Sequence, residues 1–74
     1  MNVGMRLERT CKCIKEYSCM NSGNLSTTLL EFHKDREYQV DIYPLYYQVY
    51  QNGGWDDYVY LDDNVFNKYF ELIK

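Results

Sequence analysis

Three cysteines and a histidine are the side chains of this sequence best suited to metal chemistry. Cys11, Cys13 and Cys19 form a C-x-C-x5-C cluster, and His33 is the only histidine. Three thiolates and an imidazole could complete a tetrahedral zinc site. Their spacing differs from the paired motifs of zinc ribbons and fingers, and alternate cysteines in a strand also pack well as small buried residues. We therefore expect buried or half-buried reduced thiols, and no metal or cofactor.

The other residues that could support catalysis show no catalytic arrangement. His33 has no cysteine, serine or carboxylate at a recognised catalytic spacing. The Gly53-Gly54 pair fits a hairpin turn better than a phosphate-binding loop. Asp56-Asp57 and Asp62-Asp63 could form a metal-binding carboxylate group, but the first pair also fits the rim of a sheet and the second an N-cap. We expect that the protein is not an enzyme.

Length and composition limit the architecture to one small domain. The chain has 74 residues, of which 46% are hydrophobic. We expect one ordered domain over residues 1–74, with 1–8 as a flexible N-terminal arm. No apolar run approaches the ~20 residues of a membrane helix, and the N-terminal residues lead into a charged stretch instead of a secretory signal. Together with an odd number of cysteines, these features predict a cytoplasmic protein that does not enter a membrane.

The two halves of the chain differ in charge. Residues 1–36 carry six basic and four acidic side chains, whereas residues 37–74 carry seven acidic and two basic ones. The net charge of −3 makes nucleic acid a less favoured partner. The uneven distribution favours a protein partner with a basic patch, or self-association into a homo-oligomer, although solubility alone is an alternative reason for it.

The first half of the chain has few regular patterns. Residues 10–17 alternate well enough for a strand that places two cysteines and Tyr17 on one face. Residues 18–28 are polar and indicate a long loop. A short apolar segment, 29–32, precedes a charged turn at 33–36.

Two consecutive hairpins are predicted in the second half. A two-residue loop at Pro44-Leu45 sets Val40 opposite Val49, so that apolar residues face apolar ones. For the next hairpin, a three-residue loop at 52–54 sets Tyr47 opposite Val59 and keeps the two faces separate, with Val49 opposite Asp57 as the single misfit. Both registers agree on one core face, which contains Tyr38, Val40, Ile42, Tyr47, Val49, Trp55, Val59 and Leu61.

The C-terminal segment predicts a short helix. Asp62 or Asp63 is a good N-cap, and apolar residues recur with helical spacing from Val65 to Ile73. Residues 71–74 could extend instead as a last edge strand. The expected fold class is therefore mainly β, a small and strongly bent antiparallel sheet or barrel with a short C-terminal helix.

The face opposite the core is rich in tyrosine. It contains Gln39, Asp41, Tyr43, Tyr46, Gln48, Tyr50, Asp56, Tyr58 and Tyr60. Tyrosine offers a large contact area with few rotatable bonds, and carboxylates among the rings would pair with lysine or arginine of a partner. We hypothesise a partner-binding site formed by Asp41, Tyr43, Tyr46, Tyr50, Asp56, Tyr58 and Tyr60. Two alternatives stay open: the rings only stabilise the sheet through cross-strand pairs, or the N-terminal half covers them as core.

Short motifs are spread over residues 11–73. They are Cys13-Ile14-Lys15, Tyr38-Gln39-Val40, Tyr47-Gln48-Val49-Tyr50, an Asn-Gly turn, and Phe66-Asn67-Lys68-Tyr69-Phe70-Glu71-Leu72. This pattern resembles short, mostly uncharacterised proteins of bacteriophages and related mobile elements. It departs from them at 34–37, where the family usually has Lys-Gly. The resemblance implies a small Src-homology-3-like β-barrel, no catalytic residues, and a setting in the bacterial cytoplasm during phage or prophage expression.

Small acidic phage proteins of this type often bind a host protein, and some are anti-defence inhibitors such as anti-CRISPRs. We therefore expect a non-enzymatic accessory protein that binds a host or defence protein through its acidic, tyrosine-rich face. An alternative is a small-barrel protein that stacks single-stranded nucleic acid on its rings, with Arg6, Arg9, Lys12 and Lys15 at the phosphates. A third is an assembly protein whose open strand edge pairs with a second copy.

Overall fold

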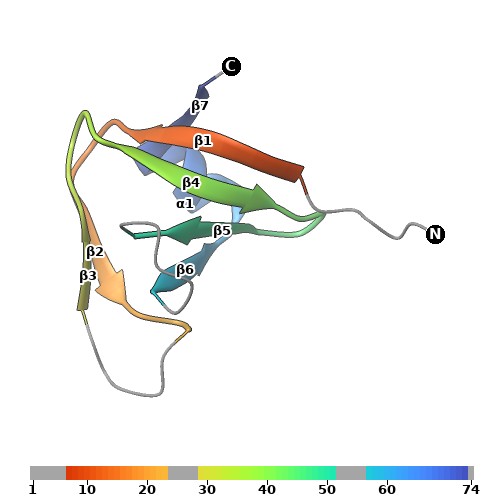
Figure 1. The fold of residues 1–74 in the computed structure, drawn as a ribbon, viewed down its shortest axis with the longest axis horizontal. Helices are drawn as coiled ribbons and strands as arrows, with labels where there is room; N and C mark the ends of the chain where they lie inside the picture. Colours follow the sequence, from red (N-terminus) through yellow and green to blue (C-terminus); the bar gives the residue numbers. More distant parts are fainter. Residues whose placement is uncertain (1–6, 24–28, 52–56, 74) are drawn as a thin grey trace.

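Seven strands and one helix make up the part of the chain that the computed structural model describes, residues 7–23, 29–51 and 57–73 (Figure 1). In chain order they are β1 (Leu7–Cys13), β2 (Tyr17–Met20), β3 (Leu29–Phe32), β4 (Glu37–Ile42), β5 (Tyr47–Tyr50), β6 (Tyr58–Leu61), α1 (Asp63–Tyr69) and β7 (Phe70–Ile73).

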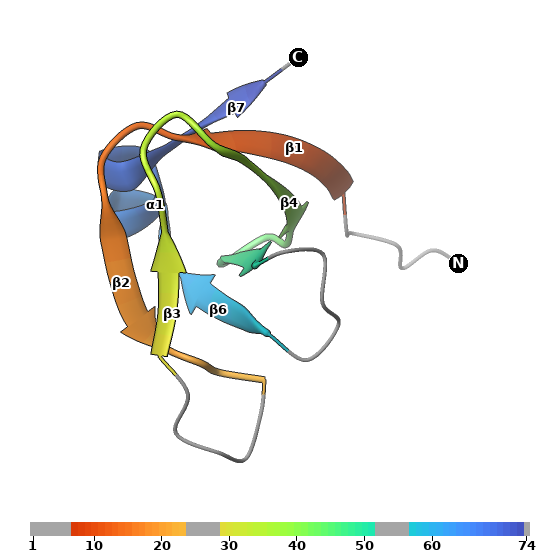
Figure 2. The same ribbon diagram turned by 60° about the vertical axis from the view of Figure 1, so that its left-hand side comes forward.

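The strands form two antiparallel sheets that meet at a bend. One sheet has the order β6-β5-β4-β1-β7, and the other is the β2–β3 hairpin. Figure 2 shows that the β1–β4 pair turns a corner and continues as the β2–β3 pair. At this corner the Cys13 amide donates to the Arg36 carbonyl at 2.9 Å, and the Asp35 amide donates to the Cys13 carbonyl at 2.7 Å. The prediction of a mainly β, bent antiparallel fold is confirmed, but the described strands leave both sheets open, so they do not close into a barrel.

The register of the first predicted hairpin is confirmed. Val40 lies opposite Val49, and the Tyr43 amide donates to the Tyr46 carbonyl at 2.9 Å across the Pro44-Leu45 turn. Because side chains alternate along a strand, this register sends every second residue of β4 and β5 to the same face.

The second hairpin is shifted by two residues from the predicted register. Val49 lies opposite Val59 and not opposite Asp57, and the Gln51 amide donates to the Asp57 carbonyl at 2.9 Å. The predicted loop at 52–54 was too short, and it lies outside the described residues. The observed register replaces a valine–aspartate pair by a valine–valine pair. A shift by an even number leaves the face assignment unchanged, which is why the faces were predicted correctly.

The core lies between the inner face of the five-stranded sheet and the residues of β3 and α1. Its buried members are Cys11, Cys13, Leu30, Phe32, Tyr38, Val40, Val49, Val59, Leu61, Phe66 and Phe70. The rings of Phe32 and Phe70 meet edge to face at 5.5 Å between centroids, and Tyr47 stacks on Phe66 at 4.0 Å. The predicted core face is confirmed for its described residues, which are buried or packed partly buried against this cluster. Trp55 lies outside the described residues.

The N-terminal half is more regular than its sequence indicates. β1 begins at Leu7, so the predicted arm at 1–8 overlaps a strand, and the predicted strand at 10–17 is interrupted at 14–16. β2 occupies part of the predicted loop at 18–28. These strands depend on partners that are distant in sequence, because β1 pairs with both β4 and β7, and β2 pairs with β3.

The C-terminal helix and edge strand are confirmed. The Asp62 side chain caps α1 by accepting a hydrogen bond from the Val65 amide at 2.8 Å. β7 then starts at Phe70, one residue before the predicted strand, and pairs antiparallel with β1. Among the described residues, no helix has the length and apolar character needed to span a membrane.

A hydrogen-bonded link joins the end of the β2–β3 hairpin to the edge strand β6. Asn21 is 9% exposed, and its side chain donates to Asp57 Oδ1 at 2.8 Å and accepts from the Gly23 amide at 2.8 Å. The Ser22 amide donates to the Tyr58 carbonyl at 2.8 Å. The position of Gly23 leaves no room for a Cβ atom, because the ring of Tyr58 lies against its backbone. These contacts tie the small sheet to the large one.

We predict that Asn21→Ala lowers the free energy of unfolding by about 1–3 kcal/mol, since it removes the side-chain hydrogen bonds to Asp57, Gly23 and Tyr58 and leaves half-buried backbone amides without this acceptor. Urea denaturation followed by circular dichroism measures this loss. Asn67→Ala on the exposed surface of α1 is the matched control and should change stability by less than about 0.5 kcal/mol. Equal losses in the two variants would contradict the proposed role of the link.

Candidate partner-binding site

Five tyrosines form a continuous row that runs from the β4–β5 turn along the outer face of β5 and β6. We call this set the tyrosine ribbon; its members, in spatial order, are Tyr43, Tyr46, Tyr60, Tyr58 and Tyr50. Successive ring centroids are 4.7, 5.0, 5.3 and 5.6 Å apart. The first pair is stacked, and the others are tilted or edge to face, which are favourable aromatic geometries.

The tyrosine ribbon is exposed at one end and buried at the other. Tyr46 is 36% and Tyr60 47% exposed, whereas Tyr50 is only 7% exposed. Asp41 is 2% exposed and accepts a hydrogen bond from the Tyr50 hydroxyl at 2.9 Å. The expectation that Asp41 and Tyr50 face solvent was therefore wrong: alternation places both on the outer face, but this part of the face is covered.

The remaining predicted site residues divide between these two environments. Tyr43 is half-buried next to the exposed end. Tyr58 is also half-buried, with its ring against Gly23. Asp56 lies outside the described residues. The part of the predicted site that a partner could reach is thus centred on Tyr46 and Tyr60.

A groove adjoins the exposed end of the tyrosine ribbon. It lies between the β4–β5 turn and the start of α1 and has a volume of about 590 Å³. We call it the turn groove. It is lined by Ile42, Tyr43, Pro44, Leu45, Tyr46, Tyr47, Asp62, Asp63 and Asn64. Leu45 is 86% exposed at its rim. The turn groove shares Tyr43 and Tyr46 with the tyrosine ribbon, so the two form one surface.

The acidic side of the turn groove is held in place by hydrogen bonds. Oδ1 of Asp62 accepts from the Val65 amide, and Oδ1 of Asp63 accepts from the Tyr47 hydroxyl at 2.9 Å. Tyr47 is itself fixed, because its ring stacks on Phe66 at 4.0 Å. Burial and the hydrogen bond to Asp63 raise the pKa of Tyr47, which keeps its hydroxyl protonated as a donor.

Leu45, Asp62 and Asp63 are site residues that were not predicted from the sequence. Other roles were predicted for these residues: Leu45 was assigned to a turn, and Asp62 and Asp63 to a helix N-terminus or to a metal-binding carboxylate group. Their proximity depends on the return of the chain from β6 into α1 beside the β4–β5 turn, which no local pattern encodes.

The cysteines and the histidine occupy separate environments. Cys11 and Cys13 are fully buried and Cys19 is half-buried, as predicted. Burial and the nearby Cys13 thiol raise the pKa of Cys11 to about 12, and burial also raises the pKa of Cys13 and of Cys19. His33 is exposed, with Nδ1 3.4 Å from Glu16. Nowhere in the described ranges do three metal-binding side chains come together.

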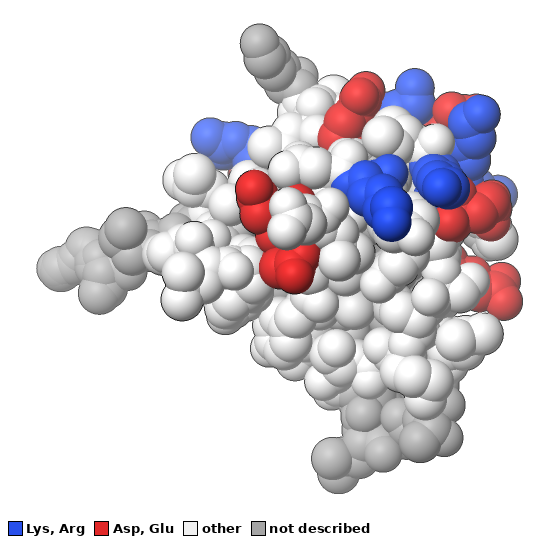
Figure 3. All heavy atoms as spheres, turned by 180° about the vertical axis from the view of Figure 1, so that it is seen from behind, with Lys and Arg blue, Asp and Glu red and all other residues white. Residues whose placement is uncertain are grey.

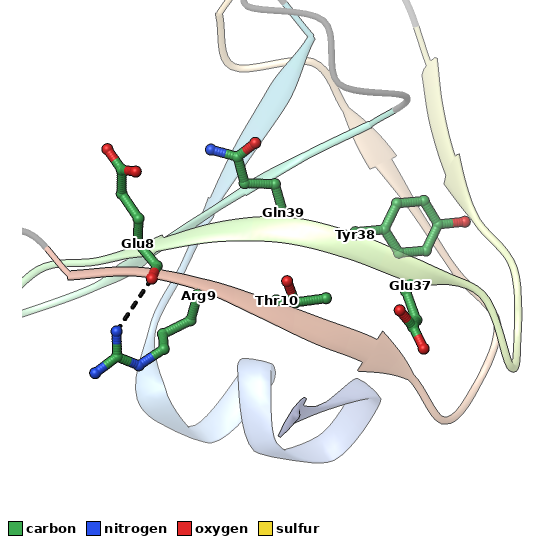
Figure 4. Close-up of a pocket in the computed structure, with 6 residues that line it drawn as sticks. All are labelled: Glu8, Arg9, Thr10, Glu37, Tyr38 and Gln39. Carbon is green, nitrogen blue, oxygen red and sulfur yellow. Dashed lines mark hydrogen bonds between the residues drawn. The ribbon is translucent and has the colours of Figure 1, made fainter. Parts of the chain in front are cut away.

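A second hollow, of about 480 Å³, lies over β1 and β4 (Figure 4). Glu8, Arg9, Thr10, Glu37, Tyr38 and Gln39 line it. The Arg9 guanidinium donates to the Glu8 carbonyl at 3.1 Å. Tyr38 is 8% exposed, so this hollow is polar and offers no exposed ring.

Among the residues that the structure describes, no lysine or arginine lines the turn groove. Figure 3 shows one face of the molecule, on which lysine and arginine lie among aspartate and glutamate. Lys12 is paired in register with Glu37, and Lys15 lies over the ring of Tyr69 at 5.7 Å. The exposed rings therefore have acidic residues as their charged neighbours in the groove.

No protein-family model, curated protein or solved structure matches this chain. The candidate site accordingly rests on its own geometry.

We predict that Tyr50→Phe lowers the free energy of unfolding by about 1.5–3 kcal/mol at neutral pH, because the buried Asp41 carboxylate loses a hydrogen-bond donor. Chemical denaturation measures the change. Tyr46→Phe removes a hydroxyl at the exposed end of the tyrosine ribbon and serves as the matched control, with a loss below about 0.5 kcal/mol. A Tyr50→Phe variant as stable as the wild type would show that the hydroxyl is dispensable.

We also predict a tyrosine that ionises late. The hydrogen bond with Tyr58, followed by desolvation and the neighbouring phenols, raises the pKa of Tyr60 to about 12 from an ordinary value of 10. The folded state then holds a proton that the unfolded chain loses above pH 10, so this stabilisation is fully present below pH 10 and disappears as the pH approaches 12. In an ultraviolet titration, Tyr60→Phe should remove the transition near pH 12, whereas Tyr69→Phe should retain it. Persistence of that transition in Tyr60→Phe would refute the assignment.

Proposed function

We propose that this protein is a non-enzymatic binding module that docks a partner protein with a basic patch. The single observation that carries the proposal is the continuity of exposed Tyr46 and Tyr60 with the turn groove, which adds Leu45 and two fixed carboxylates. Exposed aromatic and aliphatic side chains beside charged groups are typical of protein interfaces, where a few large anchors supply most of the affinity.

A protein partner is better supported than single-stranded nucleic acid. Asp62 and Asp63 line the groove beside the exposed rings and would repel phosphates. Lys12 and Lys15, expected at the phosphates in the nucleic-acid alternative, have Glu37 and the Tyr69 ring as neighbours and do not line the turn groove.

The fold proposed for this module is Src-homology-3-like. The support is the strand order β6-β5-β4-β1-β7, in which the last strand returns beside the first, together with a short helix before that last strand. A setting in a phage-infected bacterial cell, and a host or defence protein as the partner, are proposed from the sequence resemblance.

The proposal is tested by affinity capture from a bacterial lysate with the wild type and with Leu45→Ala/Tyr46→Ala. We expect the wild type to retain a protein whose capture falls tenfold or more in the double variant. A tenfold fall corresponds to a loss of ~1.4 kcal/mol of binding free energy, as expected when interface anchors are truncated. Binding of the identified protein is then measured with purified components.

The matched control for this experiment is Leu29→Ala. Leu29 is 52% exposed and lies on β3, outside the turn groove, so its truncation should leave the capture unchanged. Circular dichroism verifies that all variants are folded. Equal capture by the wild type and the folded double variant would refute the proposed site.

A further inference from the structure

We infer that the turn groove recognises an arginine side chain of the partner in preference to lysine. This inference rests on the proposed function and specifies the chemical group that the groove binds. It follows from two walls of different chemistry that line one hollow, an aromatic wall on the β4–β5 turn and an acidic wall at the start of α1.

The aromatic wall is suited to a planar cation. The rings of Tyr43 and Tyr46 stack at 4.7 Å with an interplanar angle of 26°, and Tyr60 meets Tyr46 edge to face at 5.0 Å. A guanidinium is flat and weakly hydrated, so it stacks on such a ring at a low desolvation cost. The ammonium of lysine is compact and strongly hydrated, and it gains less from the same surface.

The acidic wall is suited to a forked donor. Hydrogen bonds to Val65 and Tyr47 hold Oδ1 of Asp62 and Asp63, and among the described contacts Oδ2 of each carboxylate has no protein donor. Two immobilised carboxylates can accept several N–H groups at once, which a guanidinium supplies in a fixed plane. Because the protein already holds these acceptors, little side-chain entropy remains to be lost on binding.

The floor and rim of the turn groove fit the rest of an arginine side chain. Ile42 and Tyr47 line it as partly buried side chains, and Pro44 and Leu45 line it as exposed ones. Three methylene groups can pack along these apolar atoms while the charged end reaches the carboxylates. The hollow over β1 and β4 also contains two glutamates, but it includes Arg9 and has no exposed ring, so it lacks the aromatic half of this arrangement.

The test titrates isotope-labelled protein with hexa-arginine, hexalysine and hexacitrulline and follows amide chemical shifts. The first two peptides carry equal charge, and citrulline keeps the shape of arginine without its charge. We expect hexa-arginine to bind about three- to tenfold more tightly than hexalysine, with the largest shifts at residues of the turn groove, and hexacitrulline to bind weakest.

The variant Asp62→Asn/Asp63→Asn isolates the charge of the acidic wall. Asparagine is also a good N-cap and its amide oxygen can accept from Tyr47, so the helix start keeps its hydrogen bonds. We expect affinity for hexa-arginine to fall about tenfold. Glu37→Gln/Glu71→Gln changes the net charge equally at exposed positions on β4 and β7 and is expected to reduce the affinity by less than about twofold.

The outcomes separate this inference from the proposed function. Equal affinity of hexa-arginine and hexalysine at the turn groove would overturn the preference for arginine while leaving a site for basic proteins. Equal losses in the two double variants would overturn the role of the acidic wall. An absence of shifts at the turn groove with both basic peptides would overturn the inference and the proposed function together.

Discussion

The hydrogen bond between the Tyr43 amide and the Tyr46 carbonyl is the constraint on which the candidate site depends. It closes the β4–β5 hairpin with a two-residue turn and thereby determines which residues of both strands face inward. Tyr47 is directed to Phe66 in the core, while its neighbour Tyr46 joins the outer rings. A slip of one residue would exchange these positions and remove both the tyrosine ribbon and the support for Asp63.

The faces of the strands and the start of the helix could be predicted from the sequence, because strand residues alternate with a period of two and a helix N-cap has a preferred residue type. The alternation in β4 identified the core face correctly, and Asp62, the observed N-cap, was one of the two candidates for that position. The register of the second hairpin could not be derived from the same alternation, because a shift of two residues preserves the faces. The unfavourable opposition of Val49 and Asp57 was the available sign of error. Residues 18–20 of β2 were predicted as loop because the segment is polar, whereas the four-residue strand depends on pairing with β3.

The candidate site was predictable in composition but not in extent. The alternation of polar and apolar residues along a strand predicts the face on which a side chain lies. It does not predict whether another segment covers that face. Asp41 and Tyr50 illustrate the difference, since both lie on the predicted face and both are buried. The acidic wall was missed for a related reason: Asp62 and Asp63 adjoin the β4–β5 turn only after the whole sheet has formed.

The two fully buried thiols can report how often the structure around them opens. Cys11 and Cys13 belong to β1, the strand that holds β4 on one side and β7 on the other. A thiol that is enclosed and resists ionisation reacts with alkylating reagents only after its surroundings separate. The alkylation rate at these two positions would therefore follow the local opening of β1 in the unmodified chain, without an added fluorophore or a substituted residue.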